Sequence, residues 1–290
     1  MTTLRAGGRV LDLTRHIAVM AIVNRTPDSF YDRGATFALD AAVEAGAAAF
    51  AAGAEIVDVG GVKFAPGPPL PVDEECARVV PVIRELAPLG LVSVDTFHPA
   101  VAAAAMDAGA AIVNDTTGLH DPRMAEVVAA GDAALVIAHS LAAPRTQYPQ
   151  PHYDDVVGEV TAFLRERVAL ATSRGVSVDR IVVDPGHDLN KNTLQTLELT
   201  KRLGEFRDLG LPLLVALSNK DFVGESLDRG REGRLAGSLA AAVWCATHGA
   251  RIVRAHQVRE TVDALRMVEA IEGWRAPAYL LHNTRPEGNE

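Results

Sequence analysis

The chain has 290 residues, 48% of them hydrophobic and 22% charged, with a formal net charge of −9. Such a composition is typical of globular proteins, and the acidic balance argues against a general binder of nucleic acid or anionic membranes, because both need a basic face. No apolar run approaches the roughly 18 residues that span a bilayer, and no signal-peptide pattern follows Met1. We therefore expect a cytoplasmic protein. The cysteines, Cys76 and Cys245, form no CxxC pair and are expected to be reduced thiols.

Eight short apolar runs recur along the chain, and each is followed by a stretch with helical composition. Continuous apolar runs are typical of strands that are buried on both faces of a parallel sheet. The runs cover residues 17–23, 55–59, 91–94, 110–113, 134–138, 180–183, 213–217 and 251–253. Eight strand–helix pairs without an interrupting domain predict an α/β fold, a single (β/α)8 TIM barrel over residues 1–274, followed by a polar C-terminal tail at 275–290.

Polar residues stand at the C-terminal end of every predicted strand, where barrel enzymes carry their functional side chains. In chain order they are Asn24, Asp58, Asp95, Asn114 with Asp115, His139, Asp184, Ser218 to Lys220, and Arg254 with His256. Asp95, Asn114 and Asp184 offer acceptors, with one amide donor, for a flat heterocycle that is rich in N–H groups. His139 is more typical of a hydrogen-bonded supporting residue than of a catalyst.

The cationic residues fall after the seventh and eighth predicted strands, the usual phosphate position of this fold. Lys220, Arg254 and His256 suit the oxygens of a phosphate or pyrophosphate. Asn24 offers an oxygen ligand for a phosphate-bound Mg²⁺ or its waters. The sequence therefore predicts a site for a polar heterocycle that carries a phosphate or pyrophosphate.

Simpler interpretations of the same residues stay open. Asp184 precedes Pro185 and could cap a turn or the next helix. Lys220 and Arg254 could form ion pairs at the barrel rim with Asp58 or Asp115.

Seven short motifs, each at the end of a predicted strand, resemble those of dihydropteroate synthase. They are NRTPDSF at 24–30, DVGG at 58–61, SVDT at 93–96, ND at 114–115, DPG at 184–186, SNK at 218–220 and VRAH at 253–256. The resemblance runs from about residue 17 to residue 271. It implies a transferase that joins p-aminobenzoate to 6-hydroxymethyl-7,8-dihydropterin pyrophosphate and releases pyrophosphate.

The resemblance also implies roles for individual residues. The pterin ring would be held by Asp95, Asn114, Asp184 and Lys220. Arg254 and His256 would bind the pyrophosphate, and Asn24 would serve its Mg²⁺ end. Among these, Asp95, Lys220 and Arg254 form the implied catalytic set. The resemblance further implies a homodimer whose ligands are small molecules.

The departures from the family pattern lie on the amine side. After GG at 60–61 the family usually reads ESTRPG, a mobile loop that helps close over the amine, whereas this chain reads VKFAPG, with Phe64 and Ala65 in the altered positions. After DPG the family usually reads IGFGK, and here Leu189 replaces the aromatic residue. The family's SRKS becomes SNKD, which introduces Asn219 and Asp221. A carboxylate at 221 is expected where the substrate's own carboxylate should dock, and like charges in contact are costly.

The residues expected to bind the pterin and the pyrophosphate are thus retained, while the amine subsite is rebuilt. This pattern weighs against ordinary dihydropteroate synthesis and leaves three alternatives. One is a transferase with another amine acceptor, where Lys63 and Asp221 favour an acceptor that is not a simple anion. Another is a non-catalytic pterin-binding or regulatory paralogue. The third, a pterin-dependent methyltransferase, is disfavoured because no part of the sequence remains for a corrinoid domain.

Overall fold

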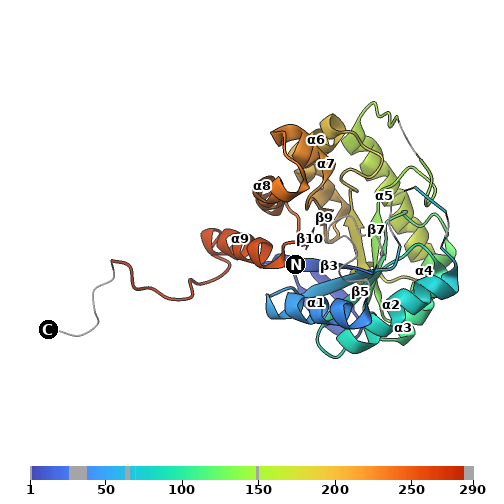
Figure 1. The fold of residues 1–290 in the computed structure, drawn as a ribbon. Coiled ribbons are helices and arrows are strands. Elements are labelled where there is room, and N and C mark those ends of the chain that lie inside the picture. The colour runs from blue at the N-terminus through green and yellow to red at the C-terminus, as the bar shows by residue number, and fades with distance from the viewer. Residues whose placement is uncertain (1, 26–37, 63–65, 69, 148–149, 284–290) are drawn as a thin grey trace.

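The computed structural model describes residues 2–25, 38–62, 66–68, 70–147 and 150–283. Its centre is a sheet of eight parallel strands in the order β8-β7-β6-β5-β4-β3-β10-β9 (Figure 1). The strands are β3 (Ala18–Asn24), β4 (Ile56–Gly60), β5 (Leu91–Asp95), β6 (Ile112–Asp115), β7 (Ala134–Ala138), β8 (Ile181–Asp184), β9 (Leu214–Ala216) and β10 (Ile252–Ala255). A parallel bridge between Val183 and Leu213 joins the two ends of the sheet. The predicted (β/α)8 barrel is therefore confirmed.

Helices surround the barrel on its outer side (Figure 1). They are α1 (Leu39–Ala51), α2 (Val72–Leu86), α3 (Pro99–Asp107), α4 (Arg123–Ala129), α5 (Val156–Ser173), α6 (Thr193–Lys201), α7 (Asp221–Leu227), α8 (Leu235–Thr247) and α9 (Val258–Ile271). Short 3₁₀ turns complete the connections at η1 (Val178–Arg180), η2 (Leu203–Leu209) and η3 (Arg231–Gly233). The connection from β9 to β10 holds two helices, α7 and α8, where the simplest repeat would hold one.

The strands separate two apolar layers because successive side chains point to opposite faces. Val19 and Val57 belong to the layer between the sheet and the helices. Met20, Ile56 and Ile112 instead belong to the layer that fills the barrel. All five side chains are fully buried, which explains why these strands read as continuous apolar runs rather than as alternating ones.

A β-hairpin that was not predicted from the sequence precedes the barrel. Its strands, β1 (Thr3–Ala6) and β2 (Arg9–Asp12), pair antiparallel through a turn in which Gly7 and Gly8 have φ of 54° and 72°. Leu4 from this hairpin and Leu13 just after it are fully buried in the layer that fills the barrel. The N-terminal end of the barrel is thereby covered, and the polar residues lie at the opposite end.

The chain leaves the barrel after α9. The guanidinium of Arg251 lies 4.9 Å from the ring centre of Trp274, which packs at this point. Residues 275–283 contain no helix or strand and extend from the barrel (Figure 1), with Tyr279 and Leu281 exposed. The remaining tail, 284–290, lies outside the described residues. Among the described helices, none is both long and apolar enough to span a membrane.

Candidate functional site

The pairing register brings polar residues from neighbouring strands to one level. Asn24 pairs with Gly60, Gly60 pairs with Asp95, and Asp95 pairs with Asn114. A Cβ at position 60 would lie 3.1 Å from Oδ1 of Asn24, so glycine allows this close approach. The C-terminal ends of β3 to β6 therefore present an amide, a carboxylate and a second amide side by side, as the sequence predicted.

Arg254 ties this row together from β10. Its Nε donates to Oδ2 of Asp58 at 2.7 Å, and its Nη2 donates to Oδ2 of Asp95 at 2.9 Å. Nδ2 of Asn114 donates to the same Asp58 oxygen at 3.0 Å. Asp58, on β4, is fully buried at the centre of the network and was not among the predicted ligand-binding residues. The simpler alternative of an ion pair between Arg254 and Asp58 is thus present in the structure.

Asp58 and Asp95 share the single guanidinium of Arg254, so one buried negative charge is left without a counter-charge. Burial raises the pKa of Asp95 to about 7, and the Asp58 carboxylate adds to this rise against the attraction of Arg254. Oδ1 of Asp58 and Oδ1 of Asn114 are buried and have no hydrogen-bond partner among the described residues. Buried acceptors without donors are rare in folded proteins. They suit a ligand whose edge supplies N–H groups.

The DPG motif forms a tight turn after β8. Oδ1 of Asp184 accepts from the backbone N–H of Gly186 at 2.8 Å, which is the turn-capping alternative for this aspartate. Gly186 has φ of 70°, and a Cβ there would lie 2.1 Å from the carbonyl oxygen of His139. Nζ of Lys220 donates to the carbonyl of His187 at 3.2 Å. Burial raises the pKa of Asp184 and lowers the pKa of Lys220, although their opposite charges offset part of both shifts.

The predicted pyrophosphate end lies after β3 and β10. His256 follows Arg254 by two residues, and its backbone N–H donates to Oγ of Ser218 at 3.2 Å. Within the described part of the chain, no group of three His, Cys, Asp or Glu side chains could hold a metal ion. The amide oxygen of Asn24 still fits Mg²⁺, because this ion is commonly held by one or two protein oxygens together with substrate phosphates.

The structure separates the predicted amine-subsite residues. Asn219 is buried and turns towards α9, with its Nδ2 3.4 Å from Oε1 of Gln257. The side chain of Asp221 is 70% exposed, and its carboxylate pairs with Nη1 of Arg234 at 2.9 Å. The charge of Asp221 is therefore balanced by an arginine that the sequence analysis had not considered. Phe64 and Ala65 lie outside the described residues.

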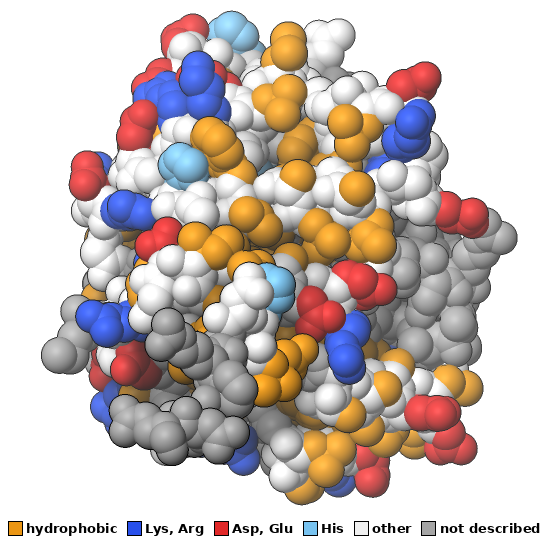
Figure 2. Space-filling view, turned by 90° about the vertical axis from the view of Figure 1, so that its left-hand side faces the viewer, with side chains coloured by type: hydrophobic (Ala, Val, Ile, Leu, Met, Phe, Trp, Pro, Cys, Tyr) orange, Lys and Arg blue, Asp and Glu red, His pale blue; other side chains and the backbone are white. Residues whose placement is uncertain are grey.

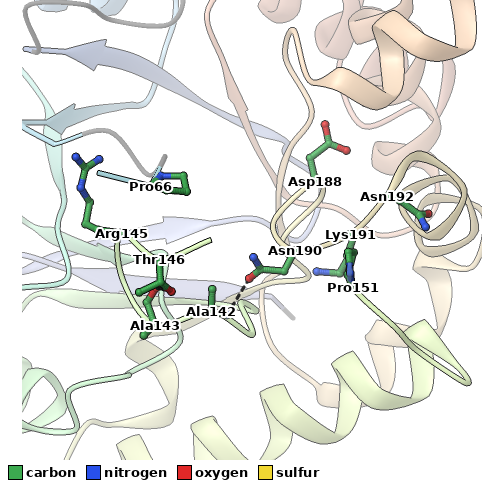
Figure 3. Close-up of a pocket in the computed structure, with 10 residues that line it drawn as sticks. All are labelled: Pro66, Ala142, Ala143, Arg145, Thr146, Pro151, Asp188, Asn190, Lys191 and Asn192. Carbon is green, nitrogen blue, oxygen red and sulfur yellow. Dashed lines mark hydrogen bonds between the residues drawn. The ribbon is translucent and has the colours of Figure 1, made fainter. Parts of the chain in front are cut away.

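A pocket of about 330 Å³ opens between the β7–α5 loop, the β8–α6 loop and the segment 66–68 (Figure 3). Its lining residues are Pro66, Ala142, Ala143, Arg145, Thr146, Pro151, Asp188, Asn190, Lys191 and Asn192. The sequence analysis missed most of these residues. The available signal was the stretch 141–152, whose Pro and Gln content is typical of an extended loop.

Lys191 lines this pocket and hydrogen-bonds to the residues around it. Its buried Nζ lies 2.9 Å from Nδ1 of His139 and donates to the carbonyls of Gly186 at 2.8 Å and Leu189 at 3.0 Å. Burial lowers the pKa of Lys191 to about 7, and burial beside this lysine lowers the pKa of His139 to about 2. His139 is thus a neutral, hydrogen-bonded supporting residue, in keeping with its predicted role.

The sequence matches the pterin binding enzyme family over residues 20–256. It is 46% identical over 282 residues to "Inactive dihydropteroate synthase 2" of Mycobacterium leprae, covering 93% of this chain and 95% of the relative. It is 41% identical over 270 residues to dihydropteroate synthase of Escherichia coli K12, covering 92% and 95%.

Solved structures agree with these matches. Yersinia pestis dihydropteroate synthase, in a sulfonamide drug complex, superposes with a TM-score of 0.89 at 36% identity, covering 94% of this chain and 100% of that one. The Xanthomonas albilineans enzyme in complex with 7,8-dihydropteroate gives 0.83 at 37% identity, with coverages of 94% and 99%. On the match across most of its length and on this shared barrel, the chain belongs to the dihydropteroate synthase family.

Proposed function

We propose that this protein binds a dihydropterin pyrophosphate at the C-terminal end of its barrel but does not form dihydropteroate at the rate of an ordinary synthase. The observation that carries this proposal is the contrast between the two sides of the site. On the pterin side, Arg254 donates to Asp58 and Asp95, and Asn114 donates to the same Asp58, at the ends of the strands. On the amine side, Asn190 stands where the family pattern reads glycine and hydrogen-bonds to Leu141 and Ala142 in the wall of the pocket.

The pterin side offers complementary groups for a flat heterocycle. The Oδ1 atoms of Asp58 and Asn114 are buried without a hydrogen-bond donor among the described residues. The N–H groups of a bound ring would supply these donors. Asp184 would accept from the ring edge, and Lys220 would donate to a ring acceptor. Asp95, whose raised pKa keeps part of its population protonated near neutral pH, is the group in this row that could exchange a proton with a bound ring.

The pyrophosphate side would be formed by Arg254 and His256, with Asn24 at its Mg²⁺ end. When bound, the ion would neutralise charge on the pyrophosphate as the bond to the pterin methylene breaks. Arg254 would keep its ion pairs with Asp58 and Asp95 while its remaining donors faced the phosphate oxygens.

The relatives support reduced synthase activity for this chain. A protein named as an inactive dihydropteroate synthase 2 is 46% identical to it, and a dihydropteroate synthase is 41% identical. Leu189 does not line the pocket, and no aromatic side chain is among the lining residues of the described chain. An aryl amine would therefore lose the flat apolar surface that the family sequence pattern provides.

The test is an incubation of purified protein with 6-hydroxymethyl-7,8-dihydropterin pyrophosphate, Mg²⁺ and p-aminobenzoate, followed by mass spectrometry for dihydropteroate. Isothermal titration with the pterin pyrophosphate alone is measured in parallel. We expect binding with little or no dihydropteroate. Product at the rate of an ordinary synthase would refute the loss of activity, and absence of binding would refute the pterin site.

A second candidate function is transfer to a different amine acceptor. It is favoured by the open pocket of about 330 Å³ and by the Arg234 partner, which removes much of the repulsion expected from Asp221. A panel of amines, assayed by pyrophosphate release and mass spectrometry, distinguishes this candidate from a non-catalytic binder. An acceptor-dependent product supports transfer, and its absence across the panel supports binding alone.

We also propose that the chain forms a homodimer through α6, α7 and α8. These helices contact one another in sequence, and they expose Leu197, Leu227 and Trp244 by 40%, 47% and 46%. Apolar side chains gather in the middle of the molecular face shown in Figure 2. Large exposed apolar patches are typical of protein interfaces. Sedimentation equilibrium should give a dimer for the natural chain and a monomer for Leu227→Glu.

A further inference from the structure

The β8–α6 loop carries two residues in a backbone conformation that glycine usually adopts. Asp188 has φ of 60° and Asn190 has φ of 51°. The family pattern usually reads glycine at both positions. Asp and Asn are the side chains that tolerate this left-handed conformation best, because they bond to nearby backbone. The loop therefore holds two polar side chains in a backbone conformation that the glycines of the family pattern would also adopt.

Among the described residues, the side-chain oxygen of Asn190 bonds to one neighbouring loop only. Its Oδ1 accepts from Oγ of Ser140 at 2.8 Å, from the N–H of Leu141 at 2.9 Å and from the N–H of Ala142 at 3.0 Å (Figure 3 shows the last of these). The hydroxyl of Tyr153 donates to the backbone carbonyl of Asn190 at 2.9 Å. One asparagine thus joins the β8–α6 loop to both ends of the β7–α5 loop.

Three further hydrogen bonds extend this connection to neighbouring segments. Oδ2 of Asp188 accepts from the N–H of Phe222 at 3.2 Å, which joins the β8–α6 loop to the start of α7. On the other side, the N–H of Gly67 donates to the carbonyl of Arg145 at 3.1 Å, and Nη2 of Arg145 donates to the carbonyl of Pro68 at 3.1 Å. The walls of the pocket therefore come from segments that are bonded to one another through side chains.

We infer that Asn190 is a positioning residue that fixes the β7–α5 loop and keeps the pocket of about 330 Å³ pre-formed. A pocket with a fixed wall binds its ligand without the entropic cost of ordering the loops. The same rigidity disfavours the repeated loop opening that turnover requires. Because Arg145, Thr146 and Asp188 line the pocket beside alanines and prolines, its ligand carries polar groups and is not a bare aryl amine. The ligand assignment rests on the proposed function, whereas the fixing of the loop does not.

The substitution Asn190→Gly isolates the side chain, because glycine adopts φ of 51° without strain. We expect the amides of Leu141 and Ala142 to exchange with deuterium about tenfold faster or more in the unliganded chain, since exchange follows local opening. Trypsin cleavage after Arg145, in the same loop, should also accelerate. The conservative variant Asn190→Asp keeps the acceptor oxygen and should preserve both properties.

Two controls keep the test decisive. Asp228→Gly replaces another left-handed residue, at the end of α7 with φ of 50°, and should leave residues 140–147 unchanged. Ser140→Ala removes one of the three donors and should give a smaller acceleration than Asn190→Gly. Unchanged exchange in Asn190→Gly, or equal acceleration in Asn190→Asp, would overturn the inference. Because the readout needs no ligand, failure of pterin binding would leave this result intact and refute only the proposed function.

Discussion

Replacing Arg254 with methionine removes the charge that the two buried carboxylates share. Arg254 gives Asp58 and Asp95 charge-assisted hydrogen bonds of 2.7 and 2.9 Å, and only 15% of its own side chain is exposed. Removing one partner of a buried ion pair typically costs about 3–5 kcal/mol, because the remaining charge is left without compensation. Asn114 still donates to Asp58 at 3.0 Å, so we expect a loss near the lower end of that range.

The loss should depend on pH in a defined direction. The pKa of Asp95 is raised from 3.8 to about 7 in the folded chain, so the folded state binds a proton more tightly than the unfolded state. Stability from this group is therefore present below the unfolded pKa and falls as the pH rises towards the folded one. Without Arg254 that fall continues to higher pH. At about 1.4 kcal/mol per pH unit, the destabilisation should be about 1–2 kcal/mol larger at pH 8 than at pH 5.5.

Urea denaturation followed by circular dichroism at both pH values measures this difference. Adding Asp95→Asn to Arg254→Met should recover much of the stability lost at pH 8, since a neutral amide needs no counter-charge. Arg180→Met is the matched control, because Arg180 is also buried but donates to the backbone carbonyls of Gly131 and Ala133. Its loss should not change between the two pH values. An Arg254→Met loss that is equal at both, or that Asp95→Asn leaves unaltered, refutes the shared-charge account.

Lys220→Met should weaken dihydropterin pyrophosphate binding by about 1.5–3 kcal/mol in isothermal titration, because a charged donor is lost, and unchanged affinity would contradict its pterin role. Glu75 is fully buried, and burial raises its pKa to about 7. Its contribution to stability therefore falls as the pH rises from about 4.5 to 7. Glu75→Gln should stabilise the chain by about 1–3 kcal/mol in denaturation at pH 8, and by less at pH 5. Leu4→Ala should cost about 2–5 kcal/mol in the same assay, since Leu4 is fully buried beneath the barrel; a cost below about 1 kcal/mol would show that the hairpin is not part of the core.

The sequence predicted the barrel well because each barrel strand is buried on both faces. Such a strand is a continuous apolar run, which can be recognised within a short segment of sequence. The hairpin at Thr3–Ala6 and Arg9–Asp12 escaped notice for the opposite reason. Its strands have four residues each; β1 alternates exposed with buried positions and β2 has no buried position, so neither carries an apolar run. Their stability depends on packing against strands that come much later in the chain, and such packing cannot be read from a short segment alone.

The candidate site was predictable in part for a similar reason. Residues at strand ends, such as Asp95 and Asn114, are placed by the register of the barrel. The pocket wall is placed by loops, and loop paths here depend on individual side chains such as Asn190 and Arg145. Asp58 lay between these cases: its position at a strand end was evident, but its role as the partner of Arg254 became clear only from the geometry.

The presence of the buried network in this chain is weak evidence that the site functions. Arg254 compensates the charges of Asp58 and Asp95, so losing Arg254 destabilises the fold whether or not the site performs chemistry. A paralogue that had ceased to act as a synthase would therefore still be expected to keep Arg254. Lys220 differs, because it donates to a backbone carbonyl and has no carboxylate within ion-pair distance among the described residues. Its retention has less structural reason, so the affinity of Lys220→Met for the pterin pyrophosphate is the sharper measure of a functioning ligand site.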